Sequence, residues 1–143
     1  MLSRILASSI VAATMCVTSC GKEDTADSLS AELVTKVEEI TSTIENVKDK
    51  GSAEKAAKSI GEIGDEFVSI AKRLDALGEP SDEDKKLVQA RMSKAMRAMN
   101  DKREDSLKTS GSVEAAVILG KAIEGFGERI KEVEETLKRF GPY

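Results

Sequence analysis

Apolar residues recur every three or four positions along most of the chain, and four stretches carry this pattern. The most regular stretches run from Ala53 to Leu77 and from Ala116 to Phe140. A shorter stretch from Leu33 to Val47 has the same spacing, and a less regular one runs from Leu87 to Leu107. Spacing that alternates between three and four residues places apolar side chains along one seam of an α-helix. The pattern therefore predicts four amphipathic helices.

Glycine and serine separate these stretches. Four glycines are placed to adopt the left-handed conformation that ends many helices, namely Gly51, Gly78, Gly111 and Gly141. Ser52, Ser81 and Ser112 follow as predicted N-caps, because their hydroxyls can accept hydrogen bonds from the first free backbone N–H groups. Short connections force consecutive helices to run antiparallel. The sequence predicts an all-α fold, an antiparallel up-down four-helix bundle over residues 28–143, with long helical hairpins that pair in a dimer as the alternative.

The core of this bundle is expected between the second and fourth stretches. The side chains predicted to be buried there are Ile63, Phe67, Ile70, Ile123, Phe126 and Ile130. The same stretches contain the internal glycines Gly61, Gly64, Gly120, Gly125 and Gly127. Each glycine costs a helix interior about 1 kcal/mol relative to alanine. Either the second and fourth helices approach each other closely at these positions, or the glycines form a groove or a hinge.

The first twenty residues, MLSRILASSIVAATMCVTSC, have a different pattern. Arg4 precedes an uncharged, mostly apolar run from Ile5 to Val17. At about 1.5 Å per residue this run would cover about 20 Å as a helix, which is less than the ~30 Å hydrocarbon core of a bilayer. It is therefore typical of a signal peptide and not of a transmembrane helix, and we expect residues 1–19 to direct export.

The segment Val17-Thr18-Ser19-Cys20 at the end of this run resembles the lipobox of bacterial lipoproteins. The resemblance implies that the signal is cleaved before Cys20, that this cysteine is lipidated, and that residues 20–27 form a short polar tether. It also implies attachment to the extracytoplasmic side of a bacterial membrane. Gly21 at the second mature position resembles lipoproteins sorted to an outer membrane where one exists. The rest of the chain is similar to small helical proteins exported by bacteria, a likeness that implies no particular activity.

Composition argues against several classes of function. The chain has no histidine, no tryptophan and a formal net charge of −4. The absence of histidine removes the commonest general base, and the sequence contains no glycine-rich phosphate loop or nucleophile motif, so we do not expect an enzyme or a cofactor. Net acidity and scarce aromatic residues disfavour nucleic-acid binding. Because Cys16 lies within the signal, no disulfide is expected in the mature chain.

Two features of the third stretch are candidate binding surfaces. Met92, Met96 and Met99 share one helical face, and thioethers at such spacing can bind Cu(I), although methionine is also a flexible core residue. The same stretch is basic, while the fourth is rich in glutamate. A basic strip could complement the fourth helix inside the bundle, contact an acidic partner or phospholipid headgroups, or be solvated. The strip consists of Lys85, Lys86, Arg91, Lys94 and Arg97.

These observations together predict a membrane-anchored lipoprotein. Its helical bundle is expected to act through contacts with an unidentified envelope protein, or as a structural element of the envelope. The membrane is the first expected partner, through the lipid on Cys20. The alternative is an extracytoplasmic helical module that binds a metal or another ligand.

Overall fold

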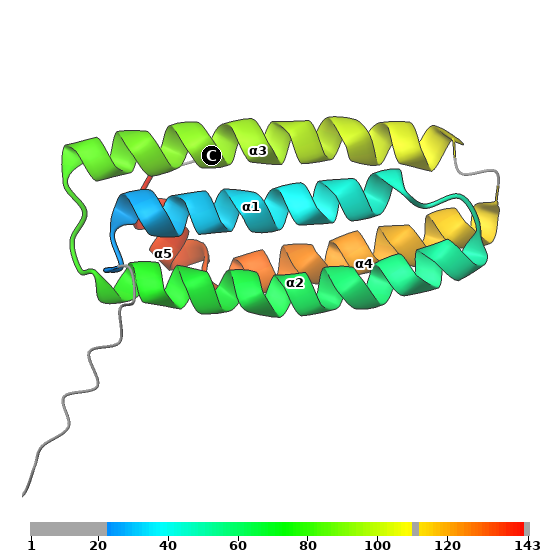
Figure 1. Cartoon of the computed structure of the whole chain (residues 1–143), viewed down its shortest axis with the longest axis horizontal. Coiled ribbons are helices and arrows are strands. Elements are labelled where there is room, and N and C mark those ends of the chain that lie inside the picture. Colours follow the sequence, from blue (N-terminus) through cyan, green and yellow to red (C-terminus); the bar gives the residue numbers. More distant parts are fainter. Residues whose placement is uncertain (1–22, 110–111, 142–143) are drawn as a thin grey trace, which may run out of the picture.

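The computed structural model describes residues 23–109 and 112–141, and these residues form five helices without a β-strand. Four long helices lie alongside one another, and a short one follows them (Figure 1). Their bounds are α1 (Ala26–Glu45), α2 (Lys50–Ala76), α3 (Asp82–Thr109), α4 (Val113–Glu132) and α5 (Glu134–Arg139). Consecutive long helices run in opposite directions, so the predicted all-α bundle is confirmed.

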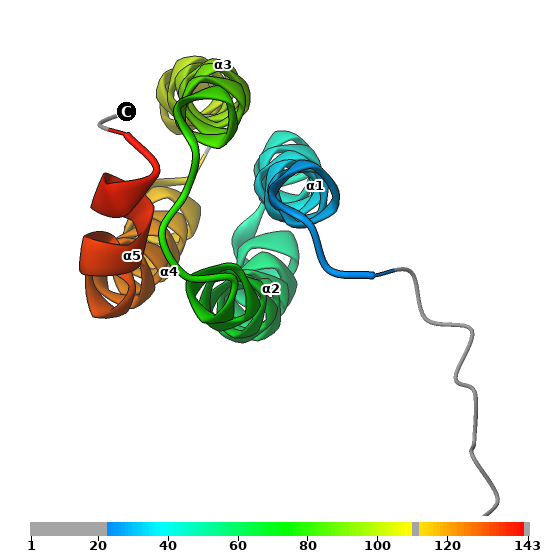
Figure 2. The same cartoon turned by 90° about the vertical axis from the view of Figure 1, so that its left-hand side faces the viewer.

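The four long helices follow one another around the bundle in the order α3, α1, α2 and α4 (Figure 2). Helix α1 packs against both α2 and α3, and α2 packs against α4. By contrast, α3 and α4 are not among the closely packed helix pairs of the described residues. The bundle is therefore open along the side between α3 and α4, which Figure 2 shows from one end.

One hydrophobic core runs through the bundle, with two phenylalanines near its centre. The rings of Phe67 and Phe126 meet edge to face, with centroids 5.4 Å apart and an interplanar angle of 83°. The predicted burial is confirmed for Phe67, Ile70, Ile123 and Phe126. The prediction was wrong for Ile63 and Ile130, which are only half-buried at the edge of the core. Ile130 lies on the open side of the bundle, where α3 does not cover it.

Several helix ends agree with the predicted stop signals. Gly78 and Gly141 have φ angles of +85° and +118°, in the left-handed region that favours glycine. The hydroxyls of Ser81 and Ser112 each accept a hydrogen bond from the backbone N–H three residues further on, so both serines cap the helices that follow them. Gly111 lies outside the described residues.

The turn between α1 and α2 differs from its prediction. Because α1 already ends at Glu45, Gly51 and Ser52 lie within the first turn of α2 and neither ends nor caps a helix. The N-cap is Asp49, whose Oδ1 accepts from the Ser52 N–H at 2.8 Å, while Ser52 Oγ accepts from the Asp49 N–H at 2.9 Å. The pKa of Asp49 is lowered by the hydrogen bonds that its carboxylate accepts from the Ser52 N–H and from the Ser52 hydroxyl. A carboxylate at this position also interacts favourably with the positive end of the helix dipole.

The predicted fourth helix is divided into α4 and α5. Val133, with φ −115° and ψ 14°, joins the two helices, and its N–H donates to the Ile130 carbonyl at 3.1 Å. The bend keeps Val133, Leu137 and Phe140 buried. It also brings Gly141 to α3, where a Cβ at this position would lie only 3.2 Å from the Cβ of Gln89. The segment after α4 therefore closes one end of the open side (Figure 2).

Candidate functional site

The predicted lipidation site, Cys20, and the predicted signal peptide lie outside the described residues. The chain is fixed to the bundle soon after this cysteine. Arg73 near the end of α2 donates from Nε to the Asp24 carboxylate at 2.9 Å and from Nη1 to Glu32 at 2.8 Å. The hydrogen bond from Arg73 lowers the pKa of Asp24. Since α1 begins at Ala26, the last residues of the predicted tether are part of the bundle.

The cations of the predicted basic strip do not share one surface. Arg91 points at α1, where it donates to Asp27 Oδ1 at 2.8 Å and to Ser30 Oγ at 2.9 Å. Ser30 is fully buried, so Arg91 ties α3 to α1. Lys85 lies 3.8 Å from Asp82 in its own helix. Two of the five predicted contact residues therefore have partners within the protein.

The other three cations, Lys86, Lys94 and Arg97, are exposed and form no ion pair with another described residue. Lys86 and Arg97 are about three helical turns apart, so they point in nearly the same direction, with Lys94 to one side. We call these three residues the outer basic surface of α3. No cation of the strip pairs with α4 among the described residues, so the suggested complementarity inside the bundle is not observed.

The methionines of α3 belong to its packed side. Met92 and Met99 are 1% and 3% exposed and form part of the hydrophobic core. Met96 is half-buried and packs against the edge of the core. This placement agrees with the interpretation of methionine as a flexible core residue. The described residues contain no group of three or more His, Cys, Asp or Glu side chains placed to hold a metal ion.

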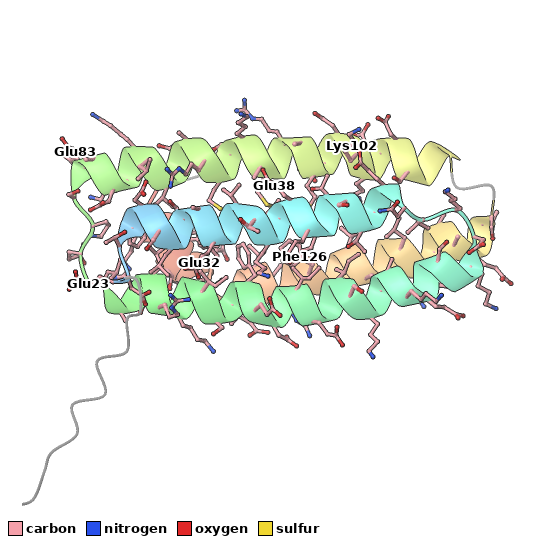
Figure 3. The ribbon with its side chains drawn as sticks, in the orientation of Figure 1. Glu23, Glu32, Glu38, Glu83, Lys102 and Phe126 are labelled. Atoms are coloured by element: carbon pink, nitrogen blue, oxygen red, sulfur yellow. The ribbon has the colours of Figure 1, made fainter. Side chains whose placement is uncertain are left out.

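A groove of about 540 Å³ runs along the open side of the bundle between α3 and α4. Apolar side chains from both helices form its floor, and Phe126 among them points into the bundle interior (Figure 3). The polar residues of the α3 rim are Asn100 and Arg103, and those of the α4 rim are Glu124, Glu128 and Lys131. This groove was not predicted as a site from the sequence, although a groove was named as one possible role of the internal glycines, and Gly120 and Gly127 line it.

The internal glycines separate into two groups. Gly64 is buried between α2 and α4, where an added Cβ would lie 2.6 Å from the Cδ of Arg129 and 3.4 Å from the Phe126 ring. The predicted close approach of the second and fourth helices is confirmed at this position. An added Cβ would meet no other described side chain within 4 Å at Gly61, Gly120, Gly125 or Gly127. Gly120 and Gly127 line the groove between α3 and α4, so the groove interpretation applies to them.

A second depression of about 490 Å³ lies between α1 and α3. Val34 and Ala95 form part of its floor, and Glu38, Glu45 and Lys94 are among its polar residues. Because α1 and α3 pack closely, it is a shallow surface feature and not an opening into the bundle.

Comparisons with known proteins do not assign this chain to a family. No family model, no curated protein and no solved structure matches it. Across residues 23–109 and 112–141, no helix combines the length and the apolar character that crossing a membrane requires. The function must be inferred from the residues themselves.

Proposed function

We propose that this protein is a bacterial lipoprotein, anchored through Cys20 on the extracytoplasmic side of a membrane, whose helical bundle acts through protein contacts. The observation that carries the proposal is the position of Val17-Thr18-Ser19-Cys20 at the end of the apolar run from Ile5 to Val17. A single acyl chain anchors a protein only marginally, whereas two or more give stable attachment. Gly21 favours the outer membrane where one exists.

The charged groups of the bundle support a role in contacts and not in catalysis. Catalytic groups are usually shifted in pKa by burial and by partners within a cleft. Here the shifts come from hydrogen bonds and ion pairs at the surface. A hydrogen bond from Lys36 to Glu66 raises the pKa of Lys36, and one from Arg129 to Asp65 raises the pKa of Arg129. Such pairs join neighbouring helices of the bundle.

The short tether limits where such contacts can form. Between Cys20 and Asp24, the first residue bound to the bundle, an extended chain reaches about 14 Å. Helix α3, with 28 residues, is about 42 Å long. The bundle would therefore act on partners close to the membrane. Its outer basic surface, Lys86, Lys94 and Arg97, suits an acidic partner because these cations are exposed.

Export, processing and mass spectrometry of the full-length protein test the anchor. We expect the protein to fractionate with membranes and its N-terminal peptide to carry acyl groups on Cys20. The variant Cys20→Ser should lose both properties, whereas the matched variant Cys16→Ser should keep them because Cys16 lies within the signal. An unmodified residue 20 in the processed protein would refute the proposal.

Crosslinking in cells tests the contact surface. The double variant Lys94→Glu/Arg97→Glu should weaken a crosslink to the acidic partner while helicity is unchanged. Arg91 is left in place because it joins α3 to α1. The control is Lys58→Glu on α2, whose side chain is 80% exposed. If the double variant retains every crosslink, the contact lies elsewhere.

A further inference from the structure

The groove between α3 and α4 leaves apolar side chains partly uncovered. Met96 from α3 and Ile130 from α4 are half-buried, and both line the groove. Gly120 and Gly127 add stretches of α4 on which no side chain stands between the helix and solvent. Covering this surface would remove apolar area from water, which favours association. The groove is therefore a candidate interface.

The two rims of the groove carry opposite charges. Arg103 lies on the α3 rim and Glu124 on the α4 rim, and both side chains are exposed. Neither forms an ion pair with another described residue. Glu128 on the α4 rim already binds Lys131 at 2.7 Å, a contact that raises the pKa of Lys131. The charge of Glu124 also raises the pKa of Lys131, although the two side chains form no ion pair. Arg103 and Glu124 are thus charges of the groove without an ion pair among the described residues.

We infer that a second copy of this chain covers the groove, related to the first by a two-fold axis parallel to the helices. Most homodimers are two-fold symmetric, and each surface patch then meets its own symmetry mate. With the axis parallel to the helices, α3 of each copy lies against α4 of the other. Arg103 of each copy then faces Glu124 of the other, and the symmetry forms this pairing twice.

The opposite choice of axis is disfavoured by the same charges. A two-fold axis perpendicular to the helices places α3 against α3 and α4 against α4. When this axis passes the helices at the height of these residues, Arg103 faces Arg103, and Glu124 faces Glu124. Like charges brought together across an interface are unfavourable, so at this register charge favours the parallel axis. Because helices α3 and α4 run in opposite directions, each helix also gains an antiparallel neighbour.

The resulting interface is itself an antiparallel four-helix arrangement. It consists of α3 and α4 from both copies, with Met96, Ile123 and Ile130 in its centre. The parallel axis points both N-termini in the same direction, so two anchored copies would enter one membrane from the same side. The inference rests on the groove and its charges and does not require the proposed anchor.

Charge reversal with mixing of variants tests the arrangement directly. Full-length copies with two different affinity tags are co-expressed and purified from whichever cell fraction holds them, with detergent if that fraction is the membrane. When both copies carry Arg103→Glu, a glutamate at position 103 of each copy faces Glu124 of the other. When both copies carry Glu124→Arg, an arginine at position 124 faces Arg103. We expect co-purification of like with like to fall tenfold or more for each variant. Arg103→Glu mixed with Glu124→Arg should recover wild-type co-purification, because each rim then meets its opposite.

The mixed pair separates this arrangement from a general loss of association. Lys58→Glu is the control, since it reverses an exposed charge on α2 away from the groove. The inference is supported if the mixture recovers wild-type co-purification and if Lys58→Glu leaves co-purification unchanged. Single variants that associate like wild type, or a mixture that fails to recover although both variants keep wild-type helicity, would overturn it. The cell fraction reports the anchor separately, so failure of one proposal is distinct from failure of the other.

Photo-crosslinking provides a measurement that needs no charge reversal. A benzophenone amino acid replaces Asn100 on the α3 rim of the full-length protein, and isotope-labelled and unlabelled copies are co-expressed. The expected product is a mixed-isotope dimer with the adduct on α4 between Gly120 and Lys131. The same probe at Lys58 should give no such dimer. If the Asn100 probe labels only another protein, a heterologous helix occupies the groove and the inference is wrong.

Discussion

Gly64 and Gly61 stand one helical turn apart on α2, and replacing each with alanine isolates the close contact between α2 and α4. At Gly61 an added methyl group meets no side chain, so Gly61→Ala should gain about 0.5–1 kcal/mol of stability from helix propensity alone. At Gly64 the same gain is opposed, because the methyl group would lie 2.6 Å from the Cδ of Arg129. Arg129 is held in place by Asp65, whose Oδ1 accepts from its Nε at 2.6 Å.

The opposing cost has two parts. Displacing Arg129 weakens a surface ion pair worth about 0–1 kcal/mol. Crowding of a packed helix interface costs a further ~1–3 kcal/mol. Gly64→Ala should therefore be about 1–4 kcal/mol less stable than Gly61→Ala, although the two changes are chemically identical. Urea unfolding of residues 21–143, followed by circular dichroism, measures this difference.

A third variant tests the cause. Arg129→Ala removes the side chain that the added methyl group at position 64 would contact. In this background, Gly64→Ala should therefore stabilise the protein nearly as much as Gly61→Ala does in the original chain. The reference for this comparison is Arg129→Ala by itself. If Gly64→Ala gains as much as Gly61→Ala in the original chain, the approach of α2 to α4 does not limit the side chain at this position, and the reasoning fails.

Three further predictions concern the core, the N-terminal contact and the link between α1 and α3. Phe126→Ala should cost about 3–5 kcal/mol in urea unfolding, since its ring is 2% exposed, and a loss below 1 kcal/mol would contradict a packed core. The hydrogen bond from Arg73 lowers the pKa of Asp24 in the folded state. The Asp24 carboxylate therefore stabilises the protein at pH values above the ordinary pKa of an aspartate. This contribution is lost as the pH falls through the lowered pKa of the folded state. A pH series should therefore show a smaller acid-induced loss of stability for Asp24→Asn. Arg91→Ala should cost about 1–3 kcal/mol because it removes the hydrogen bonds from Arg91 to Asp27 and Ser30 that join α3 to α1. Lys94→Ala should change stability by less than ~0.5 kcal/mol in the same assay.

Most of the fold could be predicted from the sequence because it follows from apolar spacing and short polar connections. The end of α2 at Gly78 could be predicted for this reason, whereas the turn between α1 and α2, just before Gly51, could not. There Asp49 and Ser52 compete to cap α2, and only the backbone conformation decides between them. The break between α4 and α5 at Val133 could not be predicted from the apolar spacing. Ile130, Val133 and Leu137 are three and four residues apart, as in an unbroken helix.

The candidate surfaces were less predictable because apolar spacing indicates which side of a helix is buried but not which neighbour covers it. Four helices can close into a ring or stay open on one side with the same pattern. The pairing of Arg91 with α1 likewise depends on Ser30 and Asp27, which are about sixty residues away in sequence. The cations of α3 therefore looked alike in the sequence, although their surroundings differ.

The contact between Arg73 and Asp24 has a mechanical consequence. Tension applied to the residues before Glu23 reaches the bundle first at Asp24 and then passes into α1, which lies between α2 and α3. Because α1 begins at this end and runs along the bundle, a pull directed away from the bundle along its axis loads α1 in shear. Its buried row must then slide past both neighbours together, so the helix cannot be peeled away one turn at a time. That row consists of Leu29, Leu33, Val37, Ile40 and Ile44.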